Sequence, residues 1–211
     1  MLKKQFLATS RGRIAALLQR GGLTVEELAS RLKLTTNAVR AQLVAMERDG
    51  LIRRAGVKRG VTKPSVTFEL SRELQQLLSG AYIPLLAHLF QVFSKGLRPG
   101  QVEMLMHQAG KSMAKEFAAS GHPSKHLESR VRAANELLTG RLGAATTVVR
   151  DHGCFLIRGA MCPLAAITDK HPFGCLVMES FVQEVVEAPV RECCDRTTPP
   201  RCCFEIGSRR E

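Results

Sequence analysis

Residues 35–50 read Thr-Thr-Asn-Ala-Val-Arg-Ala-Gln-Leu-Val-Ala-Met-Glu-Arg-Asp-Gly, and this stretch decides how the first third of the chain folds. Gly50 predicts the end of a helix here, because glycine readily adopts the left-handed conformation of a helix stop. Apolar side chains at helical spacing predict one face toward a core, namely Ala38, Val39, Leu43 and Met46. The polar side chains near the start and on the opposite side are Thr35, Thr36, Asn37, Arg40 and Gln42. Such a face is also found on ordinary solvated helices, so the flanking segments decide its meaning.

The segments before the 35–50 helix predict two shorter helices. Thr9 or Ser10 can cap the first of them. Thr24 and Glu27 have the spacing of a capping box, in which two side chains bond reciprocally to free backbone N–H groups at the start of the second. Three helices in this order are typical of a helix-turn-helix, whose third helix enters the DNA major groove and contacts base edges.

Two strand-like segments, Leu51–Arg54 and Val66–Leu70, follow the third helix and are joined by a tip with two glycines, one proline and three cations. A cationic hairpin tip is typical of a wing, which lies along phosphates or enters the minor groove. We therefore expect a winged helix-turn-helix domain over residues 1–72, although an ordinary exposed loop can also be basic. The expected DNA contacts are Thr35, Thr36, Asn37, Arg40, Gln42, Arg53, Lys58, Arg59 and Lys63.

The positive charge of the chain is concentrated in the same region. The formal net charge is +12, and residues 1–72 hold 15 of the 31 Lys and Arg residues but only 5 of the 19 Asp and Glu residues. This asymmetry indicates a polyanionic partner for the first third of the chain. With one Tyr and no Trp, the chain has few rings that can stack on unpaired bases, so a double-stranded DNA operator is the expected partner.

Nothing in the sequence predicts export, a membrane or catalysis. The first ten residues contain two lysines but no long apolar core, unlike a signal peptide. No run approaches the roughly 18 apolar residues of a membrane span. The common nucleophile, phosphate-loop, zinc-protease and dinucleotide motifs are absent from the sequence. We therefore expect a cytoplasmic protein with no membrane partner that is not an enzyme.

Residues 73–120 predict helices that are more apolar than a lone surface helix requires. The most apolar segment is 82–93, and a second helix is expected over 101–119. We expect part of this helical region to pack against a second subunit. A two-fold homodimer would place two recognition helices one DNA turn apart. The alternative is a core helix that packs only within its own chain.

Residues 121–211 predict a small α+β domain, which makes the whole chain α+β. Helices are expected from Ser124 to Leu138 and near 163–170 and 176–187. The strand-like segments are 145–150, 154–159, 189–194 and 202–206.

All seven cysteines lie between residues 154 and 203. In a reducing compartment such crowding favours a metal or redox site over structural disulfides. Cys162 and Cys175 stand at the starts of expected helices, where the helix N-terminus lowers the pKa of a thiol and favours the metal-binding thiolate. The last hairpin brings the pairs 193/194 and 202/203 together, and strand alternation points the two members of a pair to opposite faces. Spacing alone leaves open which member is a ligand.

Four thiolates suit an iron–sulfur cluster or a zinc ion. The spacing contains no Cys-x-x-Cys pair of the kind that marks a zinc ribbon. A group of reduced cysteines that binds no metal is one alternative. Redox sensing by disulfides among the two adjacent cysteine pairs is another. Cys154 is not needed for a site of four thiolates.

Three motifs follow one another in this region: Gly159-Ala160-Met161-Cys162-Pro163-Leu164, His171-Pro172-Phe173-Gly174-Cys175 and Cys202-Cys203-Phe204-Glu205-Ile206. In this order they resemble the signatures of SufR-like iron–sulfur regulators. Ala38-Val39-Arg40-Ala41-Gln42-Leu43 also resembles the Ala-Val-Arg-x-His-Leu helix of related MarR/ArsR/DeoR-type regulators, with Gln42 in place of His.

The resemblance to SufR-like regulators spans nearly the whole chain. It implies a transcriptional repressor whose DNA binding depends on a 4Fe–4S or 2Fe–2S cluster. The ligands implied by the resemblance are Cys162, Cys175, Cys202 and Cys194. The Cys-x7-Cys-x-Phe ending also resembles zinc-containing vinyl-reductase-like sensor domains, so zinc remains the alternative metal. The expected organisation is a DNA-binding domain at 1–72, a dimerisation region at 73–120 and a sensor domain at 121–211.

Overall fold

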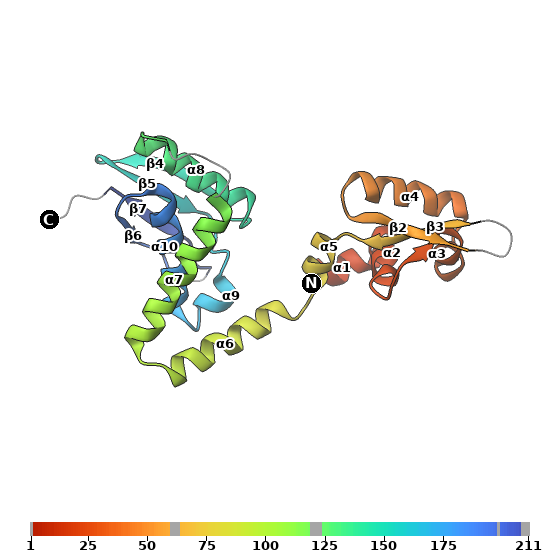
Figure 1. The fold of residues 1–211 in the computed structure, drawn as a ribbon, viewed down its shortest axis with the longest axis horizontal. Helices are drawn as coiled ribbons and strands as arrows, with labels where there is room; N and C mark the ends of the chain where they lie inside the picture. Colours follow the sequence, from red (N-terminus) through yellow and green to blue (C-terminus); the bar gives the residue numbers. More distant parts are fainter. Residues whose placement is uncertain (1, 60–63, 119–123, 198, 208–211) are drawn as a thin grey trace. The chain divides into compact units, whose positions relative to one another are not determined.

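The computed structural model describes residues 2–59, 64–118, 124–197 and 199–207. The chain divides into two compact units, Met1–Gly80 and Ala81–Glu211 (Figure 1). Each unit combines helices with an antiparallel sheet around its own hydrophobic core. The α+β class predicted from the sequence is therefore confirmed.

The first unit contains a three-stranded sheet with the order β1-β3-β2, in which both neighbouring pairs are antiparallel. The sequence does not predict α1 or the short β1, which pairs through Leu23 and Thr24 with β3. The elements of this unit are α1 (Leu2–Ala8), α2 (Ser10–Leu18), β1 (Leu23–Thr24), α3 (Val25–Leu32), α4 (Thr36–Arg48), β2 (Ile52–Lys58), β3 (Ser65–Leu70) and α5 (Arg72–Leu78).

Side-chain caps begin α2 and α3 as the sequence predicts. The Thr9 hydroxyl accepts a hydrogen bond from the backbone N–H of Gly12 at 3.0 Å. Thr24 and Glu27 form both hydrogen bonds of the capping box at the start of α3. Gly50 follows the end of α4 with a φ of 68°, the left-handed conformation that stops a helix.

The buried stripe of α4 is narrower than the sequence predicts. Val39, Leu43 and Met46 are each at most 1% exposed and form part of the core of the first unit. Ala38, which the periodicity also assigns to the core, is exposed. The correction follows from helix geometry, because Ala38 is one residue, or 100°, round the helix from the 39–43–46 stripe.

The hairpin and α5 extend further than their sequence signals. β2 continues to Lys58 instead of ending near Arg54, with a register shift between Arg54 and Gly56. Leu74 and Leu78 of α5 are buried in the same core as α4. This packing carries the compact unit past residue 72 to Gly80.

The second unit contains a four-stranded sheet with the order β4-β5-β7-β6, in which every neighbouring pair is antiparallel. The four strands lie where the sequence predicts them. The elements are α6 (Tyr82–Gly96), α7 (Pro99–Ala118), α8 (Leu127–Gly140), β4 (Thr146–Asp151), β5 (Cys154–Gly159), α9 (Ala165–Thr168), the 3-10 turn η1 (Pro172–Gly174), α10 (Cys175–Val186), β6 (Val190–Glu192) and β7 (Cys203–Ile206).

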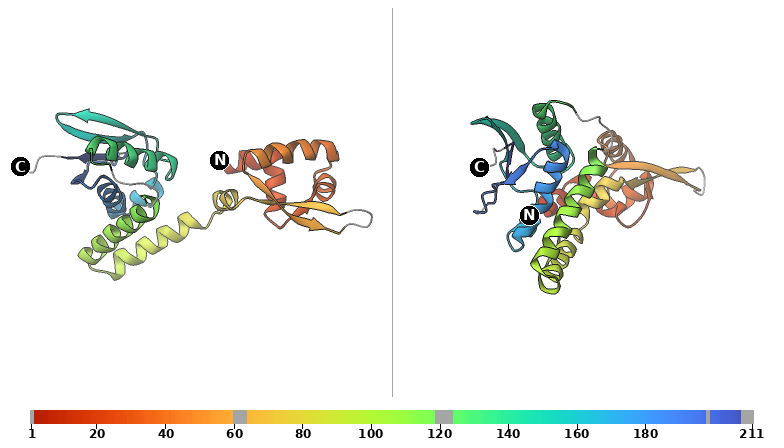
Figure 2. Two further views of the ribbon diagram at one scale, coloured as in Figure 1. Left: turned by 45° about the horizontal axis from the view of Figure 1, so that its top comes forward. Right: turned by 60° about the vertical axis from the view of Figure 1, so that its left-hand side comes forward.

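Helices cover one face of the four-stranded sheet. α8 and α10 pack on the strands, and α7 runs along α10 (Figure 2). The core between helices and sheet includes Phe181 of α10 and the strand residues Ile157, Phe204 and Ile206. Residues that alternate with these strand positions, such as Thr147 and Arg158, point to the other face and are exposed.

The apolar surface of helix α6 is broad, and only part of it is covered. Phe90 and Phe93 pack against a small buried group around Val102 and Met106. The apolar side chains that continue this surface round the helix are 40–63% exposed: Tyr82, Leu85, Leu86, Leu89 and Val92. Among the described residues no single helix has the length and apolarity to cross a membrane, although α5 and α6 meet that test when taken together across the break between them.

Candidate functional site

The four predicted ligand cysteines come from separate segments of the second unit. Cys162 lies in the loop after β5, and Cys175 is the first residue of α10. The pairing of β6 with β7 continues in one register from Val190–Ile206 to the isolated bridge Asp195–Arg201. Cys194 therefore lies directly opposite Cys202 on this hairpin.

The fold brings these four thiols into one connected group, which we call the four-thiol cluster. The thiols interact in the order Cys175, Cys194, Cys202 and Cys162, each with the next. The Cys194 thiol also donates to the backbone carbonyl of Cys203 at 3.6 Å. Three of the four are buried and Cys194 is half-buried. The cluster is thus a set of four sulfur donors shielded from bulk solvent.

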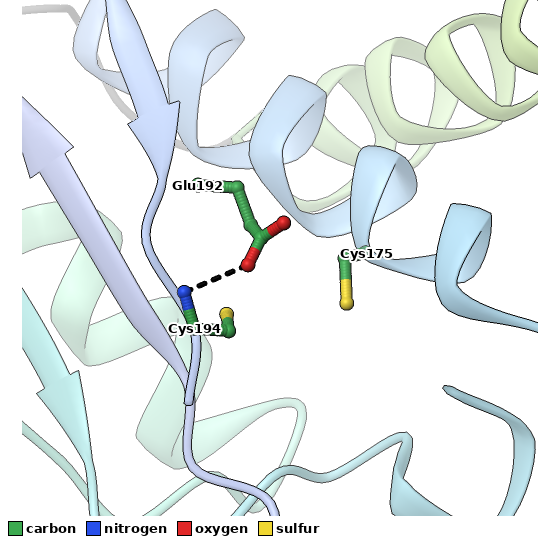
Figure 3. A group of neighbouring side chains, drawn as sticks. All are labelled: Cys175, Glu192 and Cys194. Atoms are coloured by element: carbon green, nitrogen blue, oxygen red, sulfur yellow. Dashed lines mark hydrogen bonds between the residues drawn. The ribbon is translucent and has the colours of Figure 1, made fainter. Parts of the chain in front are cut away.

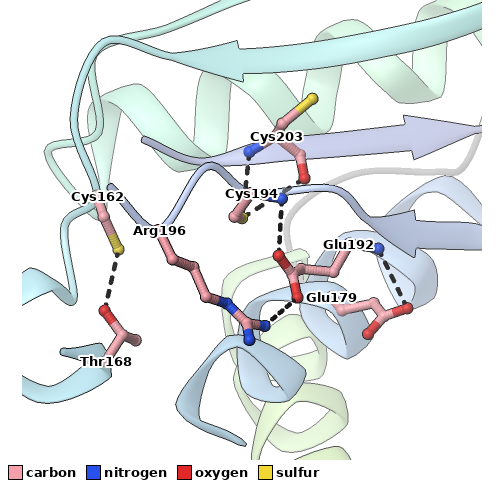
Figure 4. A network of polar contacts seen from close by, with 7 residues as sticks. All are labelled: Cys162, Thr168, Glu179, Glu192, Cys194, Arg196 and Cys203. Atoms are coloured by element: carbon pink, nitrogen blue, oxygen red, sulfur yellow. Dashed lines mark hydrogen bonds and ion pairs between the residues drawn. The ribbon is translucent and has the colours of Figure 1, made fainter. Parts of the chain in front are cut away.

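A carboxylate stands beside the cluster. One ligand atom each of Cys175, Glu192 and Cys194 lie within 4.8 Å of one another (Figure 3). Glu192 accepts the backbone N–H of Cys194 at 2.7 Å and a hydrogen bond from Arg196 at 2.6 Å (Figure 4). Glu192 is not among the residues predicted from the sequence, although its i, i+2 spacing from Cys194 on an extended segment indicates a shared face.

Contacts within the four-thiol cluster give its thiols different pKa values. The pKa of Cys162 is lowered to about 7, chiefly because Cys202 donates to it, with burial opposing and Thr168 assisting. The same bond raises the pKa of Cys202 to about 12. The pKa of Cys175 is raised by its hydrogen bond to Cys194 and by burial. Cys162 is therefore the first thiol of the cluster to lose its proton.

Two expectations about helix starts are corrected by these positions. Cys162 does not open a helix, because α9 begins three residues later at Ala165. Cys175 does open α10, but its pKa is raised instead of lowered. Hydrogen bonding between thiols outweighs the helix dipole, whose effect is confined to the first turn and is typically below about 1 kcal/mol.

Cys193 and Cys203 form a second group, which we call the outer thiol pair. Their Sγ atoms are 2.7 Å apart. Strand alternation places them on the opposite face of the hairpin from Cys194 and Cys202, and Figure 4 shows the Cys203 sulfur on the side of β7 away from Glu192. Burial and the contact with Cys203 raise the pKa of Cys193 to about 12. The Cys154 thiol belongs to neither group and donates to the backbone carbonyl of Asp151 at 2.9 Å.

Aromatic packing connects helix α6 to the residues just before Cys175. The rings of Phe90 and Phe173 are stacked with centroids 5.3 Å apart, and His171 tilts against both. A Cβ on Gly174 would lie only 3.1 Å from the Phe90 ring. A change in the position of Cys175 therefore reaches α6 through two adjacent residues.

In the first unit, the start of α4 presents the predicted polar face. Thr36, Asn37 and Arg40 are exposed, and Gln42 is half-buried. Thr35 is exposed, but its hydroxyl accepts the backbone N–H of Ala38 at 3.2 Å and caps the helix. The five side chains predicted for base contact therefore line one end of α4, with Thr35 also serving as a cap.

The predicted cations of the helix and the hairpin are exposed but mostly paired with acidic neighbours. Three ion pairs involve them: Arg40–Glu26 at 3.8 Å, Arg53–Glu69 at 3.3 Å and Lys58–Glu27 at 2.6 Å. Arg54, which is not among the cations predicted from the sequence, pairs with Glu47 at 3.0 Å. Arg59 is exposed, and Lys63 lies outside the described residues.

These pairings are weak enough for DNA to displace them. The hydrogen bond from Lys58 lowers the pKa of Glu27, so the carboxylate is charged at neutral pH. Exposed ion pairs contribute at most about 1 kcal/mol. A DNA phosphate can therefore replace the carboxylate partner of Lys58 or Arg53 at small cost.

The comparison with family models agrees with the geometry of the first unit. The family model of the DprA winged helix domain matches residues 4–56. Among solved structures, the chain is similar to HlyU from Vibrio cholerae N16961 at 30% sequence identity and a TM-score of 0.28, over 41% of this chain and 85% of that chain. The curated proteins include no match. The family match and the α2–α3–α4 order followed by the β2–β3 hairpin together identify the first unit as a winged helix-turn-helix domain.

Proposed function

We propose that this chain is a DNA-binding transcriptional repressor whose DNA binding is controlled by an iron–sulfur cluster held by Cys162, Cys175, Cys194 and Cys202. The observation that carries the proposal is the convergence of four thiols from four segments in a unit attached to a winged helix domain.

The donor set fits such a cofactor. Thiolates are the usual ligands of iron–sulfur clusters, and three of the four sulfurs are removed from solvent. The thiolate of Cys162 is already accessible near neutral pH, and metal binding displaces the remaining thiol protons. A bound cluster would supply sensitivity to oxidants and would join the four segments.

Zinc is the second candidate, and the compactness of the site favours it. The ligand atoms of Cys175, Glu192 and Cys194 lie within 4.8 Å of one another. A single Zn²⁺ binds sulfur at about 2.3 Å and so requires close donors. A multinuclear cluster holds its thiolates farther apart than one ion does, so metal analysis separates the two.

Control of DNA binding would pass through α6. Loss of the cofactor would release Cys175 and the adjoining Gly174, and Phe90 of α6 contacts this segment. The exposed apolar side of α6 is suited to a second copy of the chain, and a homodimer would set the spacing of two recognition helices. The cofactor shifts the DNA-binding equilibrium only if the two dimer geometries bind it with different affinity.

The experiment is anaerobic purification of the full chain, followed by metal and sulfide analysis, an absorption spectrum and selection of bound duplexes from a random DNA library. We expect iron, acid-labile sulfide, a visible absorption band and an enriched operator. Cys162→Ser should lose the iron and weaken operator binding at least tenfold, which corresponds to about 1.4 kcal/mol. Cys154→Ser is the matched control and should keep both.

Each of the other outcomes would reject a different part of the proposal. Stoichiometric zinc without sulfide would replace the cluster by the zinc alternative and leave the DNA-binding part intact. A colourless, metal-free protein whose operator affinity is unchanged by Cys162→Ser would reject control by a metal. Failure to enrich any duplex would reject the DNA-binding part.

A further inference from the structure

The outer thiol pair has a geometry that the four-thiol cluster does not explain. Cys193 and Cys203 lie directly opposite each other in the β6–β7 register, and the backbone N–H of Cys193 donates to the carbonyl of Cys203 at 2.9 Å. Their side chains share a face with the ion pair Arg191–Glu205, two pairs further along the hairpin. Strand alternation directs them away from Cys194 and Cys202.

This arrangement needs almost no movement to become a disulfide. The two Sγ atoms are 2.7 Å apart, and an S–S bond is about 2.0 Å long. Directly opposite residues of an antiparallel hydrogen-bonded pair have Cα atoms about 5.5 Å apart, which lies within the range that disulfides span. The backbone of the hairpin therefore already holds the two residues at bonding separation.

The pair is also open to small molecules. Cys193 is exposed and Cys203 is half-buried. Both border an open pocket of about 570 Å³, together with Arg158, Arg201 and Cys202 of the four-thiol cluster. A solvent-borne oxidant or reductant can reach the outer thiol pair through this pocket.

We propose that Cys193 and Cys203 are a reversible redox site that hydroperoxides oxidise to an intramolecular disulfide and that small thiols reduce. One thiolate attacks hydrogen peroxide, breaks the O–O bond and becomes a sulfenic acid, with hydroxide as the leaving group. The second thiol attacks this sulfur and releases water, so two thiols and one peroxide give one disulfide and two waters. Two molecules of a small thiol reverse the step by exchange. This site is separate from the proposed cofactor and does not require it.

The test maps disulfides in the full-length protein, both as purified and after removal of metal. Each sample is treated with one equivalent of hydrogen peroxide, alkylated, cleaved with trypsin and sequenced by mass spectrometry. Cleavage after Arg191, Arg196 and Arg201 places the two cysteines on different peptides. We expect a 193–203 link in most chains of both samples, lost after dithiothreitol. Cys193→Ser and Cys203→Ser should abolish the link, and Cys154→Ser should not.

A double variant, Cys194→Ser with Cys202→Ser, leaves one cysteine on each of the two peptides, so any link between them is unambiguous. The proposal is overturned if Cys193 and Cys203 stay alkylatable after peroxide, if they convert to sulfinic acid without pairing, or if the only link joins Cys194 to Cys202. None of these results depends on whether the protein binds a metal. Failure of the disulfide and failure of the proposed cofactor are therefore distinguishable.

Discussion

Arg40 stands on the exposed face of α4 and makes a long ion pair of 3.8 Å with Glu26. If it contacts a base edge, Arg40→Ala should weaken operator binding by ~1–3 kcal/mol and relax sequence preference at one position. Fluorescence anisotropy with the selected operator and with random duplex measures both effects. Arg48→Ala, at the other end of α4, is the matched control and should leave specificity unchanged. An equal loss of affinity for both duplexes would indicate that Arg40 contacts a phosphate and not a base.

Cys162 makes the stability of the metal-free protein depend on pH. Its pKa in the folded chain is about 7, below the ordinary thiol value of 9.0. The thiolate therefore stabilises the fold fully above about pH 9, and this contribution is lost as the pH falls through about 7. Between these values the contribution of Cys162 to the free energy of unfolding in urea should rise with pH by on the order of 1 kcal/mol, whereas Cys202, whose pKa is raised, contributes in the opposite direction.

The control for this pH dependence is Cys162→Ser, which removes the titrating group. Its unfolding free energy should change less over the same pH interval. Cys202→Ala should also flatten the rise, because it removes the hydrogen bond that lowers the pKa of Cys162. An unchanged slope in both variants would show that another group titrates.

At the scale of elements, the close crossing of α7 and α10 depends on Gly110, which has no side chain. A Cβ on Gly110 would lie 2.3 Å from the Val177 carbonyl oxygen and 2.7 Å from the Ser180 Cβ. Backbone cannot yield as a flexible side chain does, so Gly110→Ala should destabilise the protein by ~1–3 kcal/mol. Thermal or urea unfolding measures the change.

Gly100 is the matched control on the same helix. Nothing lies within 4 Å of a Cβ built there, so Gly100→Ala should be neutral or slightly stabilising through the better helix propensity of alanine. If the two variants were equally stable, the close approach of α7 to α10 would be wrong.

At the scale of the whole molecule, the exposed side of α6 predicts self-association. Leu85→Glu with Leu89→Glu places two charges on that side, where a dimer would have to bury them. Sedimentation analysis should find a dimer for the natural chain and a monomer with weaker operator binding for the variant. Gln91→Glu, an exposed polar position on α6, should remain dimeric. A natural chain that is monomeric with operator DNA present would contradict the expectation.

Communication between cofactor and DNA should depend on Phe90, whose ring stacks on Phe173 beside the four-thiol cluster. In Phe90→Ala, removal of the metal should change operator affinity much less than in the natural chain, where a typical coupling is about 1–3 kcal/mol. Titrations of each protein with operator DNA, with and without metal, give the ratio of the two operator affinities. Val92→Ala, on the exposed side of α6, is the control and should keep the full ratio. If removal of the metal changed operator affinity as much in Phe90→Ala as in the natural chain, the coupling would not pass through Phe90.

Local patterns in the sequence predict much of this molecule because they depend on neighbouring residues alone. The capping box at Thr24 and Glu27, the stop at Gly50 and the four C-terminal strand segments are of this kind. Side chains alternate between the two faces of a strand, and this likewise places Cys193 and Cys203 on the face opposite Cys194 and Cys202. Composition alone locates the excess of positive charge in the first third of the chain.

Tertiary structure decided what depends on residues distant in sequence. Which thiols become neighbours follows from where α10 and the β5–α9 loop meet the hairpin, and the contact with Cys194 together with burial reversed the expected pKa shift of Cys175. The same holds for the carboxylate of Glu192 beside the cluster and for the acidic partners of Arg40, Arg53 and Lys58. The reason is physical: hydrogen bonds and charges act over a few ångströms in space, and only the packed fold sets those distances.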